Sequence, residues 1–154
     1  MSGAGAAAKG GRFNPKGVEA LYLALSIEGM IAEMGHGFGS RFEPLTICSY
    51  TLDVDDVVDL TSEDARSFAR VALDDLACAW ADCLSRRRRP ASWDVARRLI
   101  AGGAAGILVP SFAAHARPGM VNLVLWTWGP DLPHRVLVHD PSGRLPLDQS
   151  AWPR

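Results

Sequence analysis

The sequence is poor in cysteine, has no excess of charge of one sign and contains no long apolar run. Its three cysteines form no Cys-x-x-Cys pair, which argues against a disulfide framework and a structural zinc site. A net charge of −1 gives no general basis for binding nucleic acid or an anionic membrane. No apolar stretch approaches the ~20 residues that cross a bilayer, and the first residues lack a signal-peptide block. These absences predict a cytoplasmic protein that does not act at a membrane.

The composition is that of a globular protein of one domain. Hydrophobic residues make up 48% and charged residues 21% of the 154 residues, which is enough apolar surface for a packed core. Residues 1–9 are rich in glycine and alanine and are predicted to form a flexible lead-in. Residues 10–154 are predicted to form a single domain.

Apolar runs and turn residues alternate along the chain without the regular strand–helix–strand order of a parallel fold. Strands are predicted over 19–25, 45–52, 57–60, 106–109, 121–128 and 135–139. Helices are predicted over 27–34, 63–73, 74–85 and 93–101, with Ser26 and Ser92 as N-caps of the first and the last. The pattern predicts an α+β fold, with a mixed or antiparallel β core flanked by helices.

Several common sequence signals are incomplete. The glycine-rich stretch 3–8 lacks the strand and the acidic residue of a dinucleotide fingerprint, and the stretch 35–40 lacks the lysine of a phosphate-binding loop. The four histidines never reach the spacing of metal ligands, so no metal site is expected. The arginines at 86–89 are interpreted as a solvated helix end, with nucleic-acid contact as the alternative.

One group of residues is suited to binding and chemistry. Arg12 lies in a glycine-rich turn, Tyr22 in an apolar strand and Glu33 on the following helix. A guanidinium fits phosphate oxygens, a tyrosine ring stacks on a heterocycle, and a glutamate with apolar helical neighbours is partly desolvated and needs a partner or a role. Together the three suit a ligand with a pyrophosphate and an aromatic leaving group. From spacing alone, a surface arginine, a core tyrosine and a solvent-facing glutamate remain the alternative.

The sequence resembles the RES domain, the toxin of a class of bacterial type II toxin–antitoxin pairs, in the blocks GGRFNPKG (10–17), ALYLALS (20–26), IAE (31–33), GILVPS (106–111) and NLVLW (122–126). The order and spacing of the blocks match over most of the chain. The resemblance implies an ADP-ribosyltransferase-like fold and a toxin that consumes NAD and inhibits growth. It also implies a small helical DNA-binding antitoxin that covers the active site, so that nucleic acid is contacted only through this partner.

The resemblance further implies roles for single residues. Arg12, Asn14 and Tyr22 fall on the block that binds NAD, and the family's catalytic glutamate falls on Glu33. The family's serine matches Ser111, which is expected to act with Glu33. Ser92, at the start of the preceding predicted helix, is the competing serine and is expected to contact NAD.

The sequence departs from the family pattern at its start, where nine residues precede Gly10 and a further arginine of the family has no counterpart. This departure predicts a more open pocket and favours the transfer of ADP-ribose to a target protein. Two alternatives remain open. One is an NAD glycohydrolase or phosphorylase that depletes cellular NAD, and the other is a non-catalytic module that binds a nucleotide or a peptide.

Overall fold

The computed structural model describes residues 2–34 and 47–145 and contains two β-sheets. The four-stranded sheet has the order β1-β5-β4-β3, and the two-stranded sheet pairs β2 with β6. The strands are β1 (Leu21–Ala24), β2 (Tyr50–Val54), β3 (Val57–Asp59), β4 (Gly106–Pro110), β5 (Val121–Leu125) and β6 (His134–Val138). Every pairing is antiparallel except that of β3 with β4. The predicted α+β class with a mixed β core is therefore confirmed.

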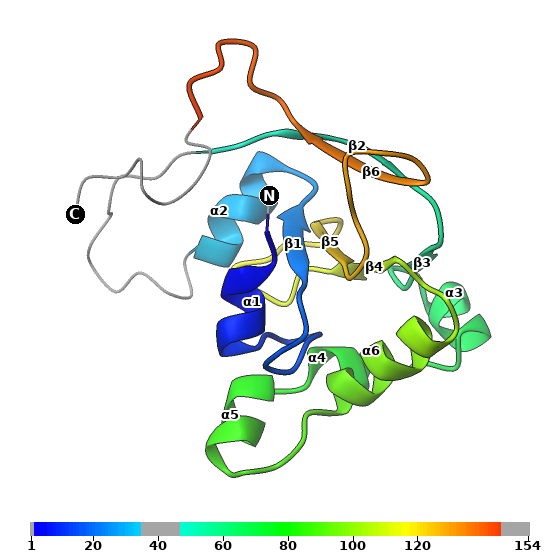
Figure 1. Ribbon diagram of the computed structural model, residues 1–154. Helices are drawn as coiled ribbons and strands as arrows, with labels where there is room; N and C mark the ends of the chain where they lie inside the picture. Colours follow the sequence, from blue (N-terminus) through cyan, green and yellow to red (C-terminus); the bar gives the residue numbers. More distant parts are fainter. Residues whose placement is uncertain (1, 35–46, 146–154) are drawn as a thin grey trace.

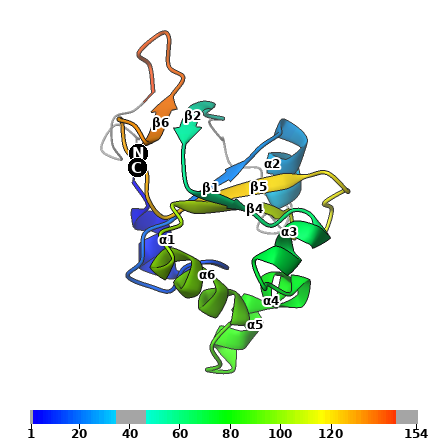
Figure 2. The same ribbon diagram turned by 90° about the vertical axis from the view of Figure 1, so that its right-hand side faces the viewer.

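The helices lie mainly on one side of the larger sheet. They are α1 (Ala4–Lys9), α2 (Ile27–Met34), α3 (Glu63–Phe68), α4 (Leu73–Ala77), α5 (Trp80–Ser85) and α6 (Ala91–Ala101). Figures 1 and 2 show α4, α5 and α6 below this sheet, with β2 and β6 above it. The parallel pairing of β3 with β4 requires a long crossover, and α3 to α6 form it. None of the helices in the described ranges has the length and apolar character to span a membrane.

Strand β5 separates two hydrophobic cores because its side chains alternate between the faces of the sheet. Val124 faces the helices and packs in a core with Leu60, Leu76 and Ile107. Leu123 and Leu125 face the two-stranded sheet and pack in a second core with Val136. On the edge strand β1, Tyr22 lies opposite Val124 and so shares its face, while Leu21 and Leu23 pack toward the second core. The register of β1 therefore decides that Tyr22 points to the helical side.

Residues 1–9 were predicted to be a flexible lead-in, whereas the structure forms helix α1 there. Alanine has the highest helix propensity, and Lys9 lies in the last turn, where a cation suits the helix dipole. A helix of six residues is too short to be stable alone, so its contacts with the rest of the chain must hold it. Gly10, with φ of 76°, ends the helix and turns the chain back toward the sheet.

The predicted helices over 63–73 and 74–85 are each interrupted, and arginines from elsewhere in the chain bind the carbonyl oxygens at the interruptions. Arg98 donates from Nη1 to Ala69 O (2.9 Å) and from Nη2 to Arg70 O (3.1 Å), between α3 and α4. Arg12 Nη1 donates to Leu76 O (3.2 Å) and Cys78 O (2.6 Å), between α4 and α5. Helix ends leave carbonyl groups without intrahelical partners, and a guanidinium satisfies them. Tertiary contacts therefore override the continuous helical pattern.

Other predicted elements lie close to their observed positions. Helix α2 has the predicted bounds, and Ser26 Oγ accepts a hydrogen bond from Gly29 N (3.0 Å), as expected of its N-cap. Strands β1, β2, β3 and β5 are shorter than predicted, whereas β4 ends one residue later and β6 is shifted by one residue. Residues 45–46 of the predicted strand 45–52 lie outside the described residues. The prediction that Ser92 caps the last helix is wrong. Helix α6 begins at Ala91, and the Ser92 side chain instead donates to Arg12 O (2.5 Å).

The core position of Ile107 on β4 gives a first prediction. Its side chain is fully buried, so Ile107→Ala is expected to lower the free energy of unfolding by about 2–5 kcal/mol through lost burial and a residual cavity. The matched control is Phe68→Ala, because Phe68 is 93% exposed and its change should stay within about 0.5 kcal/mol. Urea unfolding measures both variants, and equal losses would contradict the assignment of the core.

Candidate functional site

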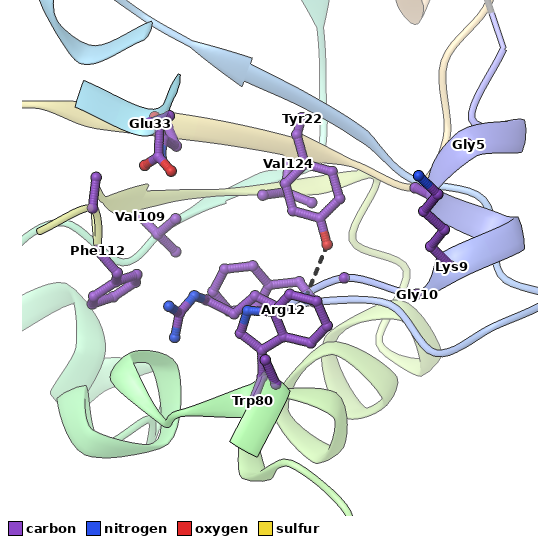
Figure 3. Close-up of a pocket in the computed structure, with 16 residues that line it drawn as sticks. Gly5, Lys9, Gly10, Arg12, Tyr22, Glu33, Trp80, Val109, Phe112 and Val124 are labelled. Atoms are coloured by element: carbon purple, nitrogen blue, oxygen red, sulfur yellow. Dashed lines mark hydrogen bonds between the residues drawn. The ribbon is translucent and has the colours of Figure 1, made fainter. Parts of the chain in front are cut away.

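A cavity of about 590 Å³ opens between the four-stranded sheet and the helices. This volume lies within the range of small-molecule sites. Residues from α1, the following turn, β1, α2, α5 and the loop after β4 all contribute to its wall. Figure 3 shows Glu33 at one end, Lys9 at the other, and Tyr22, Arg12 and Trp80 between them.

Glu33 is held in place by two hydrogen bonds to the same carboxylate oxygen. Ser111 Oγ donates to Glu33 Oε1 (2.6 Å), and Asn122 Nδ2 donates to that oxygen as well (2.6 Å). The three residues come from α2, the loop after β4 and the strand β5. The sequence predicted a partly desolvated glutamate, whereas Glu33 is exposed. The carboxylate therefore has a fixed position and remains open to the cavity and to solvent.

Asn122 is a site residue that sequence reasoning missed. It lines the cavity, and its Oδ1 is buried without a hydrogen-bond partner among the described residues. An asparagine inside the apolar run 121–128 was the available signal, because a polar side chain in such a strand needs a partner. Its amide group can donate to Glu33 only when Nδ2 faces the carboxylate, which leaves Oδ1 on the other side.

Tyr22 presents its ring to the cavity and anchors its hydroxyl in the turn that precedes β1. Its hydroxyl donates to Asn14 Oδ1 (2.7 Å) and accepts from Phe13 N (2.9 Å). A Cβ at Gly11 would lie 2.6 Å from the Tyr22 hydroxyl oxygen, so only glycine allows this close approach. The residue as a whole is 41% exposed, but burial around its hydroxyl raises the pKa of Tyr22 to about 12.

Arg12 contacts both the cavity and the junction between α4 and α5. One guanidinium nitrogen is bound to the carbonyl oxygens of Leu76 and Cys78, and the guanidinium lies 4.9 Å from the ring centre of Phe112. Burial lowers the pKa of Arg12, and the nearby groups Cys78, Glu33 and Tyr22 oppose that shift. Its Nε and Nη2 have no hydrogen-bond partner in the described part of the chain, so they remain able to bind an anion.

The family model of the RES domain matches residues 1–148. The chain belongs to the RES domain family. This result confirms the family that the sequence blocks around Arg12, Tyr22 and Glu33 indicated. No curated protein shows a significant sequence match to the chain.

A solved structure supports the same assignment. This RES chain is similar to a chain in the crystal structure of the M. tuberculosis MbcT-MbcA toxin-antitoxin complex, with 28% sequence identity and a TM-score of 0.50. The match covers 91% of this chain and 74% of that chain. The predicted fold class, α+β and ADP-ribosyltransferase-like, is thereby confirmed.

The structure separates the predicted site residues of this RES chain into two groups. Arg12, Tyr22 and Glu33 line the cavity, and Ser111 reaches it through its hydrogen bond to Glu33. Asn14 and Ser92, both predicted to contact NAD, are fully buried and bound to the protein itself.

The buried pair has identifiable partners. Asn14 Nδ2 lies within hydrogen-bond distance of Ala6 O, Pro15 O and Val18 O, and Ser92 also accepts from Cys78 Sγ (3.3 Å). Neither side chain lines the cavity, and the contact with NAD that was expected of them stays a prediction. Through these hydrogen bonds, Asn14 is expected to position the Tyr22 side chain and Ser92 the backbone of Arg12.

Three further residues of the wall were not expected from the sequence: Lys9, Trp80 and Phe112. Trp80 begins α5 directly after the interruption at Cys78, and Phe112 stacks on Arg12. The contribution of Trp80 depends on the interruption of the predicted helix 74–85, which sequence periodicity gave no means of locating. In the described ranges, no group of three or more histidine, cysteine, aspartate or glutamate side chains could hold a metal ion, and all three cysteines are free and half-buried.

The raised pKa of Tyr22 predicts how stability depends on pH. A phenol with a pKa of about 12 in the folded state and 10.0 when unfolded contributes stability that is present below pH 10 and is lost as pH rises toward 12. Absorbance of the tyrosinate band and unfolding in urea, both measured between pH 9 and 12, check this expectation. Tyr22→Phe should remove the late titration step and flatten the decline, and an unchanged pH dependence in this variant would contradict the assignment.

Proposed function

We propose that this protein is the toxin of a toxin–antitoxin pair, which cleaves NAD at the nicotinamide–ribose bond and transfers ADP-ribose to a target protein. The observation that carries the proposal is the position of Glu33. A carboxylate fixed by Ser111 and Asn122 faces the same cavity as an aromatic ring and a guanidinium. A site of this kind stabilises positive charge next to a bound heterocycle and a bound anion.

The three side chains correspond to three parts of NAD. The Tyr22 ring offers a flat apolar face on which nicotinamide can stack. The Nε and Nη2 donors of Arg12 suit a pyrophosphate oxygen, since a guanidinium forms charge-assisted hydrogen bonds with phosphate. The remaining oxygen of the Glu33 carboxylate then lies where the ribose carbon that bears nicotinamide would react.

The reaction is a displacement at that ribose carbon. The bond from carbon to the nicotinamide nitrogen breaks, its electron pair leaves with nicotinamide, and the carbon acquires oxocarbenium character. The Glu33 carboxylate stabilises this charge and accepts the proton of the incoming nucleophile, as carboxylates do in glycoside cleavage. A new bond forms between the ribose carbon and the acceptor atom of the target protein.

A small helical antitoxin is the partner that this proposal requires. The similar crystal structure is of a toxin-antitoxin complex, and a toxin of this kind must be inhibited until it is released. We expect the antitoxin to cover the cavity around Arg12, Tyr22 and Glu33. Nucleic acid would then be contacted through the antitoxin alone.

Hydrolysis of NAD is the second candidate, and the exposure of Glu33 favours it. Because the carboxylate is open to solvent, water can reach it as easily as a protein side chain can. The product would be free ADP-ribose, and growth would stop because NAD is depleted. Both candidates use the same cleavage step and differ only in the nucleophile.

The acceptor is identified by incubating the protein with cell lysate and NAD labelled in its adenylate phosphate. Transfer is expected to place the label on protein, because the acceptor side chain becomes the new substituent of the ribose carbon. Gel electrophoresis and mass spectrometry of the labelled bands measure it. Label found in free ADP-ribose and not on protein would contradict the transfer and establish hydrolysis, and the absence of nicotinamide release would contradict both.

Replacing the carboxylate tests the role of Glu33. Glu33→Gln keeps the size of the side chain but removes its charge, and is expected to lower kcat for nicotinamide release by roughly 10²–10³-fold. The matched control is Glu28→Gln, since Glu28 lies exposed on the same helix and does not line the cavity. A folded Glu33→Gln variant that releases nicotinamide at the wild-type rate would rule out this mechanism.

A further inference from the structure

We infer that Lys9, at the end of α1, forms an anion subsite for the phosphate groups of the ligand, so that the site selects phosphorylated nucleotides over nucleosides. This inference rests on the proposed function and adds a residue to its binding machinery. It depends on how α1 is held, on the turn that follows it and on the distribution of charge along the cavity.

Helix α1 is held against the rest of the chain by contacts along its length. Asn14 Nδ2 donates to Ala6 O (3.0 Å), and Gly17 N donates to Ala7 O (2.8 Å). At the start of the helix, a Cβ on Gly3 would lie 2.8 Å from Glu19 Cβ and 2.8 Å from the Trp128 ring, so the backbone packs closely there. These contacts fix the backbone that carries Lys9.

The turn after α1 brings Lys9 and Arg12 to the same cavity. Gly10 adopts a φ of 76°, which reverses the chain direction directly after Lys9, and Gly10 N donates to Ala6 O (2.7 Å). Gly10 and Gly11 both line the cavity and carry no side chain that would fill it. The residues on either side of this turn therefore present their side chains to one space.

The cavity has a negative side chain at one end and a positive side chain at the other. Figure 3 shows the Glu33 carboxylate at one end and the Lys9 side chain at the opposite end, with the Tyr22 ring between them. Lys9 has no hydrogen bond or ion pair to any residue in the part of the chain that the structure describes, and its side chain is exposed. A ligand with a cationic ring and an anionic group is oriented by this arrangement, because each charge lies near its opposite.

Phosphate is the ligand chemistry that fits Lys9 best. A lysine ammonium is a compact point charge with three donors on a flexible stem, and it binds phosphate oxygens without requiring one geometry. Arg12 has already bound two carbonyl oxygens with one of its nitrogens, so a second cation can bind the phosphate oxygens that Arg12 does not reach.

The test compares Lys9→Gln with Lys16→Gln, Lys9→Arg and the wild type. Lys16 is a lysine of the same turn region that does not line the cavity, so its removal changes the net charge by the same amount. Calorimetry measures the Kd for inorganic pyrophosphate, and initial rates measure KM and kcat for NAD. Lys9→Gln is expected to raise both the Kd and the KM by roughly 10-fold while kcat is retained, because one charged hydrogen bond is lost. Lys9→Arg and Lys16→Gln should stay close to the wild type.

The outcomes separate this inference from the proposed function. If Lys9→Gln binds pyrophosphate and NAD as Lys16→Gln does, the subsite is disproved even when NAD is cleaved. If the wild type releases no nicotinamide but its pyrophosphate binding depends on Lys9, the proposed reaction fails and the subsite stands. A wild type that binds neither pyrophosphate nor NAD overturns the subsite.

Discussion

The buried side chain of Asn14 holds together the segments that form the cavity. Its amide nitrogen lies near three carbonyl oxygens, including that of Ala6 in α1, and its amide oxygen accepts from the hydroxyl of Tyr22 on β1. A buried amide without partners costs free energy, so these contacts are needed together. Through this one side chain, α1, the turn with Arg12 and the ring of Tyr22 keep fixed positions relative to one another.

Two arginine side chains bind backbone carbonyl oxygens at the places where helices of the helical layer end. Arg12 and Arg98 each bind carbonyl oxygens where a helix stops, so the segments 63–73 and 74–85 fold as short helices. The interruption at Cys78 allows Trp80 to line the cavity. Arg12 therefore has two roles, since it binds the junction of α4 and α5 and also presents its remaining donors to the cavity.

The reactive end of the cavity is built in a different way. Glu33 comes from α2 and receives both of its hydrogen bonds from the far end of the chain, from Ser111 and Asn122. Both donors bind Oε1, and Oε2 has no hydrogen-bond partner within residues 2–34 and 47–145. This arrangement lies in a chain that belongs to the RES domain family. Glu33 and Lys9 place opposite charges at the two ends of the cavity.

The sequence by itself determined the α+β class, the bounds of helix α2 with its Ser26 cap, and the group Arg12, Tyr22 and Glu33, because periodicity, capping and a short motif are local properties. It did not determine that α1 is helical, since a helix of six residues depends on contacts made elsewhere. Only the tertiary structure decided that Ser111 meets Glu33 while Ser92 is buried behind Arg12. It also decided the role of Asn122, because the partners of Glu33 lie 78 and 89 residues away, and no local pattern records a hydrogen bond over such a distance.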